Sequence, residues 1–504
     1  MIYLGIDCGT QSLKVLAWDP EKEVVGSASK AYGLIEGLSP GHKEQHPDNW
    51  LVALTECVQD LRAQEVDLET VCGIGISGQQ HGLVVLDEKH QVIRPAKLWC
   101  DTSTESQCRK IVASAGGLEA YRNEVGNALP PGFTASKVLW LKENEPSKYA
   151  QVCYMLLPHD YLNFYLTGEM VSEAGDASGT GYFNVRKRQW SAQALSWIDS
   201  ERNLMSCLPR LIESQESTGQ LRPSLAKEWG MRPEVLVSSG GGDNMMGAIG
   251  SGNVALGTVT VSLGTSGTLY TFSDSPIIDP DGEIAAFCDS TGGWLPLGCT
   301  MNVTVATEMI RTGFEGYGLE EFNRLVEGVP AGTEGLVLLP YLEGERMPNV
   351  ALGTGVLLGL RPRTASTAHL ARAAMEGVTL GLYYGIERFS ELGVSPAGIR
   401  LIGGGAKSRV WRQMVADIFG LSVVCLKNQE GPAFGAALQA FWCCEQGEME
   451  DLVSTHVVLD ESTRHQPSPE MQDLYSRLYV LYKKFSRTLI HSDVFETHRE
   501  FIGS

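Results

Sequence analysis

Two short glycine-containing turns, half a chain apart, are the residues of this sequence best suited to hold phosphate. The first lies in MIYLGIDCGTQSLKVLAWD (1–19) and a weaker echo lies in VTVSLGTSGTLYTFSD (259–274). Each is an apolar strand, a turn built on Gly-Thr and a second strand. Glycine has no Cβ, so the N–H groups of such a turn can close on phosphate oxygens. Asp7 in the first copy is matched by Ser262 in the second, and a pair with one acid suits a metal–triphosphate site.

The first turn carries the larger set of chemically useful groups. Asp7 can order Mg²⁺ through water, and Lys14 can supply a positive charge. The residues whose amides and hydroxyls can face phosphate oxygens are Gly9, Thr10, Gln11 and Ser12. A plain β-hairpin turn is the alternative, since Gly-Thr is common there, but the echo in the second half favours phosphate binding.

A carboxylate follows a three-glycine run in GGGDNMMGAIGSG (240–252). Asp243 at this place can be a general base, a metal ligand or a helix cap, and the cap is the commonest fate of such an acid. Glycines destabilise a structure by roughly 0.5–1 kcal/mol each where they are not needed. The run therefore favours a site that needs close approach, and we expect Asp243 to be a catalytic base.

A third glycine run, LIGGGAKSRVWRQMVAD (401–417), joins an apolar strand to a helical pattern. It lacks the spacing of a Walker loop. It suits the adenosine part or the phosphates of a nucleotide at a helix N-terminus, and a tight strand–helix turn is the alternative.

Polar groups gather in SGQQHGLVVLD (77–87) and KLWCDTST (97–104). A small polyol needs several donors and acceptors and one aromatic face. The residues that could supply them are Gln79, Gln80, His81, Trp99 and Asp101. A lone histidine is more often structural than a ligand. The clustering of these groups in loops nevertheless favours substrate binding.

Short β-rich runs alternate with longer helical patterns, which is typical of α/β proteins. We expect strands at 2–7, 13–19 and 71–78, a mostly helical stretch from 116 to 208, and long helices at 367–392 and 467–491. The strand–turn–strand repeat predicts an internal duplication. The small-residue stretch 247–257 then separates a first lobe (1–247) from a second (248–445), with a helical tail (446–504) that packs on the second lobe.

Composition limits the partners and the cell compartment. The 504 residues carry a net charge of −20, which disfavours nucleic acid and anionic membranes as partners. No run approaches the ~18 apolar residues of a spanning helix, and the N-terminus enters a strand without a leader pattern. The 12 cysteines are scattered without metal-binding spacing, which suggests reduced thiols. We expect a cytoplasmic protein.

These motifs together resemble the FGGY carbohydrate kinases, over residues 1 to about 444. DCGTQS and SLGTSG resemble the two phosphate motifs of that family, GGGDN its catalytic aspartate and GGGAKS its adenosine motif. Two longer signatures also match, GFTASKVLWLKEN (132–144) and GVLLGLRPRTASTAHLARAAME (355–376). The resemblance implies an actin-like, ribonuclease H-like fold of two lobes with the active-site cleft between them.

Within that family, GQQHG, LWCDTST and LPYLEGER look most like the kinases of xylulose. Gln80 is a departure, because many bacterial members of that group have Met there, and the sugar pocket can differ locally. Glycerol kinases carry an Arg-Glu pair that this chain lacks near His81, which makes glycerol a poor candidate.

The resemblance also assigns roles to residues. It implies Asp243 as the base and Asp7 near Mg²⁺ and the phosphates. The residues implied at the sugar are Gln80, His81, Asp243 and Asn244. Those implied at ATP in the second half are Gly264, Thr265, Ser266, Gly404, Gly405 and Ala406, to which we add Ser408 at the start of the following helix. The expected reaction moves the γ-phosphoryl group of ATP to a hydroxyl of a ketopentose, and O5 of D-xylulose is the favoured acceptor. The resemblance also suggests a homodimer.

Two alternatives remain open. A kinase for ribulose, L-xylulose or another polyol would share every phosphate motif and differ only around 79–81 and 99–101. A sensor of the same fold would bind nucleotide and sugar without transferring phosphate, although Asp7, Asp243 and both phosphate turns argue against it.

Overall fold

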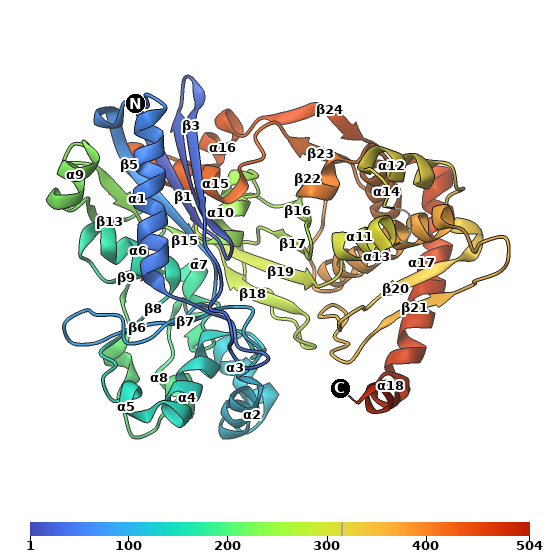
Figure 1. Ribbon diagram of the computed structural model, residues 1–504, viewed down its shortest axis with the longest axis horizontal. Helices are drawn as coiled ribbons and strands as arrows, with labels where there is room; N and C mark the ends of the chain where they lie inside the picture. Colours follow the sequence, from blue (N-terminus) through green and yellow to red (C-terminus); the bar gives the residue numbers. More distant parts are fainter. Residues whose placement is uncertain (314–315, 504) are drawn as a thin grey trace.

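The computed structural model describes residues 1–313 and 316–503 and divides into two halves that lie side by side (Figure 1). Each half is built on a mixed seven-stranded sheet with helices packed against it. This architecture confirms the expected α/β class.

The first sheet has the order β13-β14-β5-β1-β2-β3, with β15 also paired to β5. β1 (Ile2–Cys8), β2 (Ser12–Asp19) and β3 (Glu23–Ala31) form an antiparallel meander, and β5 (Val71–Gly78) runs parallel to β1. The shorter strands are β13 (Ser217–Gln220), β14 (Leu236–Ser238) and β15 (Gly241–Gly242). Apolar residues fill both faces of β1, as expected for a strand covered on both sides.

The second sheet has the order β18-β19-β17-β16-β22-β23-β24. β16 (Thr258–Leu263) pairs antiparallel with β17 (Gly267–Thr271) and parallel with β22 (Gly398–Ile402), just as β1 pairs with β2 and β5. The other strands are β18 (Ile284–Cys288), β19 (Trp294–Thr300), β23 (Val423–Leu426) and β24 (Leu459–His465). The shared pairing confirms the internal duplication.

Helices of each half cover its sheet. The first half has α1 (Pro47–Ala63), α6 (Pro158–Thr167), α7 (Ala174–Ala177) and α9 (Pro223–Trp229), with a helical group of α2 (Glu105–Ser114), α3 (Leu118–Val125), α4 (Thr134–Asn144), α5 (Pro146–Tyr149) and α8 (Ala192–Ile198). The second half has α11 (Thr304–Gly313), α12 (Leu319–Glu327), α13 (Thr367–Glu391) and α14 (Arg409–Phe419). Short paired strands complete the fold: β4 (Glu44–Gln45) with β7 (Ala96–Lys97), β6 (Val84–Leu86) with β8 (Tyr154–Leu156), β9 (Val171–Glu173) with β12 (Arg210–Ile212), β10 (Phe183–Asn184) with β11 (Gln189–Trp190), and β20 (Val337–Pro340) with β21 (Gly355–Leu358).

Two helices cross closely where the halves meet. α15 (Gly431–Glu445) comes late in the sequence but packs on β1 and β5 of the first sheet and on α10 (Asp243–Gly250). A Cβ on Gly5 would lie 1.8 Å from the carbonyl oxygen of Ala433, and one on Gly435 would lie 1.8 Å from that of Met246. Only glycine permits such contacts, so these positions tie the end of the second half to the first sheet.

The segment after residue 445 is not purely helical, which corrects the expectation for 446–504. It contributes β24 to the second sheet, between α16 (Met449–His456) and the long α17 (Pro469–Ile490), and it ends in α18 (Val494–Ile502). Tyr475, Tyr479 and Tyr482 of α17 are buried in the core of the second half. Met449 and Val453 of α16 instead belong to the core that includes α15. In the part of the chain that the structure describes, no helix combines the length and the apolar character needed to cross a membrane.

Candidate active site

The ends of three neighbouring strands bring the residues of the first half together. β1 and β15 both run parallel to β5, with Asp7 opposite Ser77, Gly241 opposite Ser77 and Gly242 opposite Gly78. The residues that follow these strands are the 9–12 turn, 79–81 and Asp243. Parallel strands end at one edge of a sheet, so segments more than 200 residues apart meet there.

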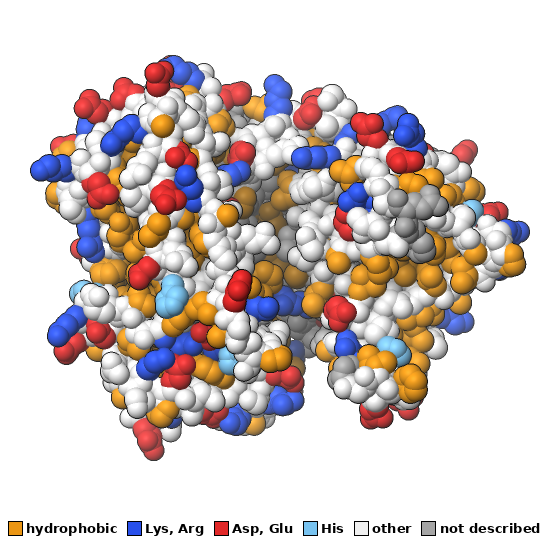
Figure 2. All heavy atoms as spheres, viewed as in Figure 1, with side chains coloured by type: hydrophobic (Ala, Val, Ile, Leu, Met, Phe, Trp, Pro, Cys, Tyr) orange, Lys and Arg blue, Asp and Glu red, His pale blue; other side chains and the backbone are white. Residues whose placement is uncertain are grey.

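The same arrangement repeats in the second half. Ser262 of β16 is opposite Ile402 of β22, so the 264–266 turn and the 403–406 run leave the same sheet edge. Gly403 has φ 88°, and a Cβ there would lie 2.8 Å from the carbonyl oxygen of Leu263. Gly404 faces open space and Thr265 is exposed, as a nucleotide cradle requires. Figure 2 shows a hollow between the two halves.

Asp243 is the first residue of α10 and is half-buried. Its Oδ1 accepts hydrogen bonds from Asn244 N at 2.8 Å and Asn244 Nδ2 at 3.0 Å, and the N-cap is Gly242. Burial, together with the charges of Asp7 and Asp176, raises the pKa of Asp243 to about 7. A carboxylate with this pKa is well matched to accept a proton near neutral pH.

Asp7 is the penultimate residue of β1, and one of its carboxylate oxygens is held by a hydrogen bond. Its Oδ1 accepts a hydrogen bond from Ser77 Oγ at 2.8 Å. Burial raises its pKa to about 6, although Ser77 and Lys14 act in the opposite direction. Carboxylate oxygen is a ligand that suits Mg²⁺, so this residue, beside a turn that is partly exposed, fits a hydrated Mg²⁺ ion.

Lys14 forms an ion pair with Glu430, which immediately precedes α15. Both side chains are about one-third exposed, and the charges of both reach Asp7. Glu430 therefore belongs to the charged group around Asp7. Glu430 lies outside every glycine motif, so no sequence pattern pointed to it.

Gln79 is buried, and its side chain is engaged within the protein, so its contacts do not support the expectation that it binds substrate. It is 1% exposed. Its Oε1 accepts a hydrogen bond from Thr10 Oγ1 at 3.1 Å, and its Nε2 donates to Gly9 O at 3.3 Å and Gln45 Oε1 at 3.2 Å. Gln79 therefore fixes the first phosphate turn from behind.

His81 is held in one tautomer. Its Nδ1 lies 2.8 Å from Gly179 O, which can only accept, so Nδ1 carries the proton and Nε2 is left as an acceptor. The ring stacks on Phe133 at 4.4 Å between centroids, and burial lowers its pKa to about 3. A neutral imidazole with a free Nε2 can accept a hydrogen bond from a hydroxyl.

Gln80 links the segment that carries His81 to Asp243 through Asn244. Its Oε1 accepts a hydrogen bond from Asn244 Nδ2 at 2.9 Å. Trp99 is half-buried, and its Nε1 donates to Thr10 Oγ1 at 2.9 Å. The polar segment after β5 therefore lies next to two other parts of the site. Gln80 contacts the GGGDN segment, and Gln79 and Trp99 both bond to Thr10.

Asp101, also expected at the sugar, is fully buried, and both of its carboxylate oxygens accept hydrogen bonds from within the protein. Oδ2 accepts from Lys97 Nζ and from Lys43 N, both at 2.9 Å, and Oδ1 accepts from Ser103 N at 3.0 Å. Its visible role is structural, because it belongs to an ion-pair network with Lys97.

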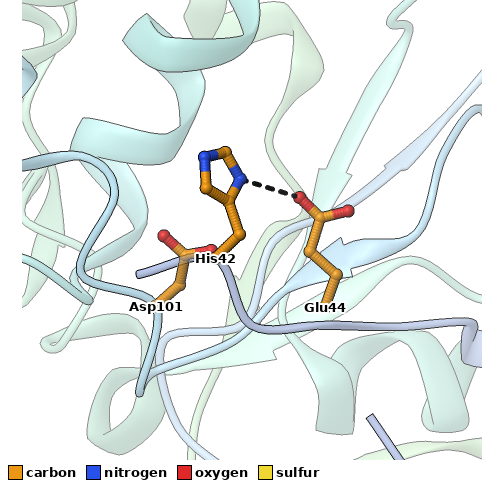
Figure 3. Close-up of side chains that lie close together, drawn as sticks. All are labelled: His42, Glu44 and Asp101. Carbon is orange, nitrogen blue, oxygen red and sulfur yellow. Dashed lines mark ion pairs between the residues drawn. The ribbon is translucent and has the colours of Figure 1, made fainter. Parts of the chain in front are cut away.

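Asp101 lies with His42 and Glu44 in a group whose spacing would suit a metal ion (Figure 3). The Lys97 ammonium lies 2.9 Å from Asp101 Oδ2, 3.2 Å from Glu44 Oε1 and 3.1 Å from His42 Nδ1. A cation supplied by the chain already occupies the centre of this group, so it does not fit a metal.

The second half also reaches the 79–81 segment. The Phe287 ring of β18 lies 5.8 Å from the His81 ring, and the charge of Arg346 lowers the His81 pKa. Arg346 is exposed and lies in LPYLEGER, a stretch noted only for its resemblance. No spacing rule could have linked it to His81, because they are 265 positions apart.

Fold and site together define a two-lobed α/β protein with a Gly-Thr turn on each lobe and a carboxylate of raised pKa at the sheet edge of one of them. The family models "FGGY family of carbohydrate kinases", N-terminal and C-terminal domains, match residues 2–250 and 259–444. The xylulose kinase of Haemophilus influenzae is 42% identical over 487 residues, which cover 95% of this chain and 98% of that protein. The chain belongs to the FGGY family of carbohydrate kinases.

Solved structures agree with this membership. A ligand-bound xylulose kinase from Lactobacillus acidophilus matches with a TM-score of 0.90 at 26% identity, over 97% of this chain and 99% of that one. A gluconate kinase from the same organism matches with the same TM-score and identity, over 97% and 98%. The predicted family and two-lobed fold are confirmed, and the protein is an ATP-dependent sugar kinase.

Proposed function

We propose that this enzyme transfers the γ-phosphoryl group of ATP to the O5 hydroxyl of a ketopentose, with D-xylulose as the preferred substrate. The observation that carries the proposal is the position of Asp243, a carboxylate with a pKa of about 7 on the same sheet edge as Asp7 and the first phosphate turn. Phosphoryl transfer needs positioning and charge neutralisation more than covalent catalysis. The 42% identity to a xylulose kinase favours that sugar among the ketopentoses.

In this proposal Asp243 holds the attacking hydroxyl and accepts its proton. Gln80, His81 and Asn244 orient the sugar, with the free Nε2 of His81 accepting from one hydroxyl. The Trp99 ring supplies the apolar face. Asp101 and Gln79 support the structure behind these residues and are left out of the sugar site.

The ATP site of the proposal spans both halves. The phosphates lie between the 9–12 turn and Gly264, Thr265 and Ser266, and the adenosine lies at Gly404, Gly405 and Ala406 near Ser408. Asp7 would hold Mg²⁺, which supplies charge neutralisation when bound. Lys14 is drawn from Glu430 toward the phosphates.

The wider expectations are part of the same proposal. An ATP-consuming enzyme with 12 free cysteines fits the cytoplasm. We also propose a homodimer, which sedimentation analysis would test directly.

A coupled ADP-release assay over D-xylulose, L-xylulose, D-ribulose, glycerol and gluconate tests the substrate. We expect the highest kcat/KM with D-xylulose. A clear preference for ribulose or gluconate would replace the proposed substrate, and no sugar-stimulated ADP release would favour a sensor of the same fold.

Replacing the proposed base gives the sharpest mutational test. Asp243→Ala should retain ATP affinity but lose phosphorylation by ~10²-fold or more, since a positioned base contributes on that scale. Calorimetry measures the nucleotide and the ADP assay measures turnover. Near-normal turnover of the variant would end the assignment.

A further inference from the structure

Asp176 lies behind the sugar residues, and the proposed reaction does not use it directly. It belongs to α7 and has no exposed surface. Its Oδ2 is 2.6 Å from Nδ1 of His159, a residue of α6 that is equally buried. A short contact between two buried groups fixes the Asp176 side chain firmly.

The other carboxyl oxygen faces Gln80. Asp176 Oδ1 and Gln80 Nε2 are both buried, and among the described residues neither has a hydrogen bond of ordinary geometry. A Cβ on Gly242 would lie 3.0 Å from both Asp176 Oδ1 and Gln80 Cδ. The Gln80 amide also lowers the pKa of Asp176, against the much larger rise that burial causes. An acceptor and a donor without other partners therefore face each other across a glycine.

The turn that carries Asp176 also holds His81. Gly179 N donates to Asp176 O at 3.0 Å, and Gly179 O accepts from His81 Nδ1 at 2.8 Å. One short segment thus contacts both of the adjacent residues that we place at the sugar.

We propose that Asp176 is a positioning residue that sets the orientation of the Gln80 carboxamide, and through it that of Asn244 and Asp243, for sugar recognition. This inference rests on the proposed function and deepens it.

Hydrogen-bond direction links Asp176 to Asn244 through the Gln80 carboxamide. Oδ1 of Asp176 is an acceptor whichever member of its pair with His159 carries the shared proton. It therefore draws the Gln80 NH₂ group inward and leaves Gln80 Oε1 to accept from Asn244 Nδ2 at 2.9 Å. Asn244 Nδ2 also donates to Asp243 Oδ1 at 3.0 Å. The Asn244 carbonyl is thereby left free to accept from a sugar hydroxyl.

Asp176→Asn keeps the shape but can present an NH₂ group to Gln80. The Gln80 carboxamide must then either lose its interaction with residue 176 or rotate by about 180°. After such a rotation its NH₂ group would face the NH₂ group of Asn244, and the hydrogen bond between these two side chains would be lost. We expect the sugar KM to rise ~10-fold or more while the ATP KM stays within about twofold.

Asp160→Asn is the matched control. Asp160 is as buried as Asp176 and lies 3.1 Å from the other ring nitrogen of His159, but its second oxygen binds Leu157 N at 2.9 Å. Among the described residues, no hydrogen bond or ion pair joins it to a residue that we place at the sugar. We expect a lower melting temperature with an unchanged sugar KM.

A double-mutant cycle with Gln80→Met tests whether Asp176 acts through Gln80. In the Gln80→Met background, Asp176→Asn should change the sugar KM less than twofold. An unchanged sugar KM in the single variant, equal rises in both KM values, or additive effects in the cycle would overturn the inference. Absence of sugar-dependent ADP release from the unaltered enzyme would instead count against the proposed function.

Discussion

At the scale of single residues, the site depends on how burial and hydrogen bonding prepare a few polar groups. Asp243 and Asp7 are ordinary carboxyl groups whose pKa values rise to about 7 and about 6 because the protein removes them from water and places acids nearby. His81 is made neutral by burial and given one tautomer by Gly179. The surroundings of each group thus set the pH range in which it carries a proton.

The raised pKa of Asp243 predicts the pH dependence of the reaction. A base works only when deprotonated, so kcat/KM for the sugar should rise about tenfold per pH unit below pH 7 and level off above it. Initial rates at saturating Mg²⁺, with kcat/KM extracted between pH 5 and 9, measure this limb. A flat profile down to pH 5 would show that no group of this kind limits the reaction.

At the scale of elements, parallel strand pairs decide what meets at the site. β1, β5 and β15 end together, as do β16 and β22, so five sequence motifs reach two sheet edges. The α10–α15 crossing adjoins the site, because α10 carries Asp243 at its first position and α15 follows Glu430. Glycines at the crossing are therefore as important to the site as to the core.

The crossing can be tested with one methyl group. Gly435→Ala places a Cβ 1.8 Å from Met246 O, and we expect a destabilisation of about 1–3 kcal/mol or more, since overpacking forces backbone shifts. Gly431→Ala in the same helix is the control, because no atom lies within 4 Å of its Cβ. Thermal unfolding compares the two, and equal melting temperatures would show that the crossing tolerates expansion.

At the scale of the whole molecule, the site is divided between two related lobes with a hollow between them. The residues that we propose for the sugar belong to the first lobe, and those that we propose for adenosine belong to the second. Phe287 and Arg346 of the second lobe already reach His81. Closure would bring the remaining parts together and exclude water, which otherwise hydrolyses ATP.

Closure predicts a change in shape that needs both ligands. Small-angle scattering should show a smaller radius of gyration with D-xylulose and a non-hydrolysable ATP analogue together than with either alone. ATP hydrolysis without sugar should also be at least ~10²-fold slower than sugar phosphorylation. An unchanged radius together with fast sugar-free hydrolysis would contradict a closing cleft.

The sequence by itself determined the elements and the motifs. Alternating apolar strands, the repeated Gly-Thr turns and the GGGDN run act over a few residues, so the α/β class, the duplication and the roles proposed for Asp7 and Asp243 could be read locally. The expectation for residues 446–504 missed β24, because a polar edge strand such as LDESTRH has little apolar periodicity to reveal it.

Only the tertiary structure decided which polar side chains face the hollow and which are buried behind it. Gln79 and Gln80 are neighbours of one type, yet one fixes the phosphate turn and the other faces Asn244. Asp101 looked free in the sequence, but Lys97 holds it in the interior. Asp176 gave no sequence signal, because the role we propose for it depends on its contact with His159, 17 positions away, and on Gln80, which lies far earlier in the chain. Burial and hydrogen-bond direction depend on long-range packing, and a local pattern does not encode them.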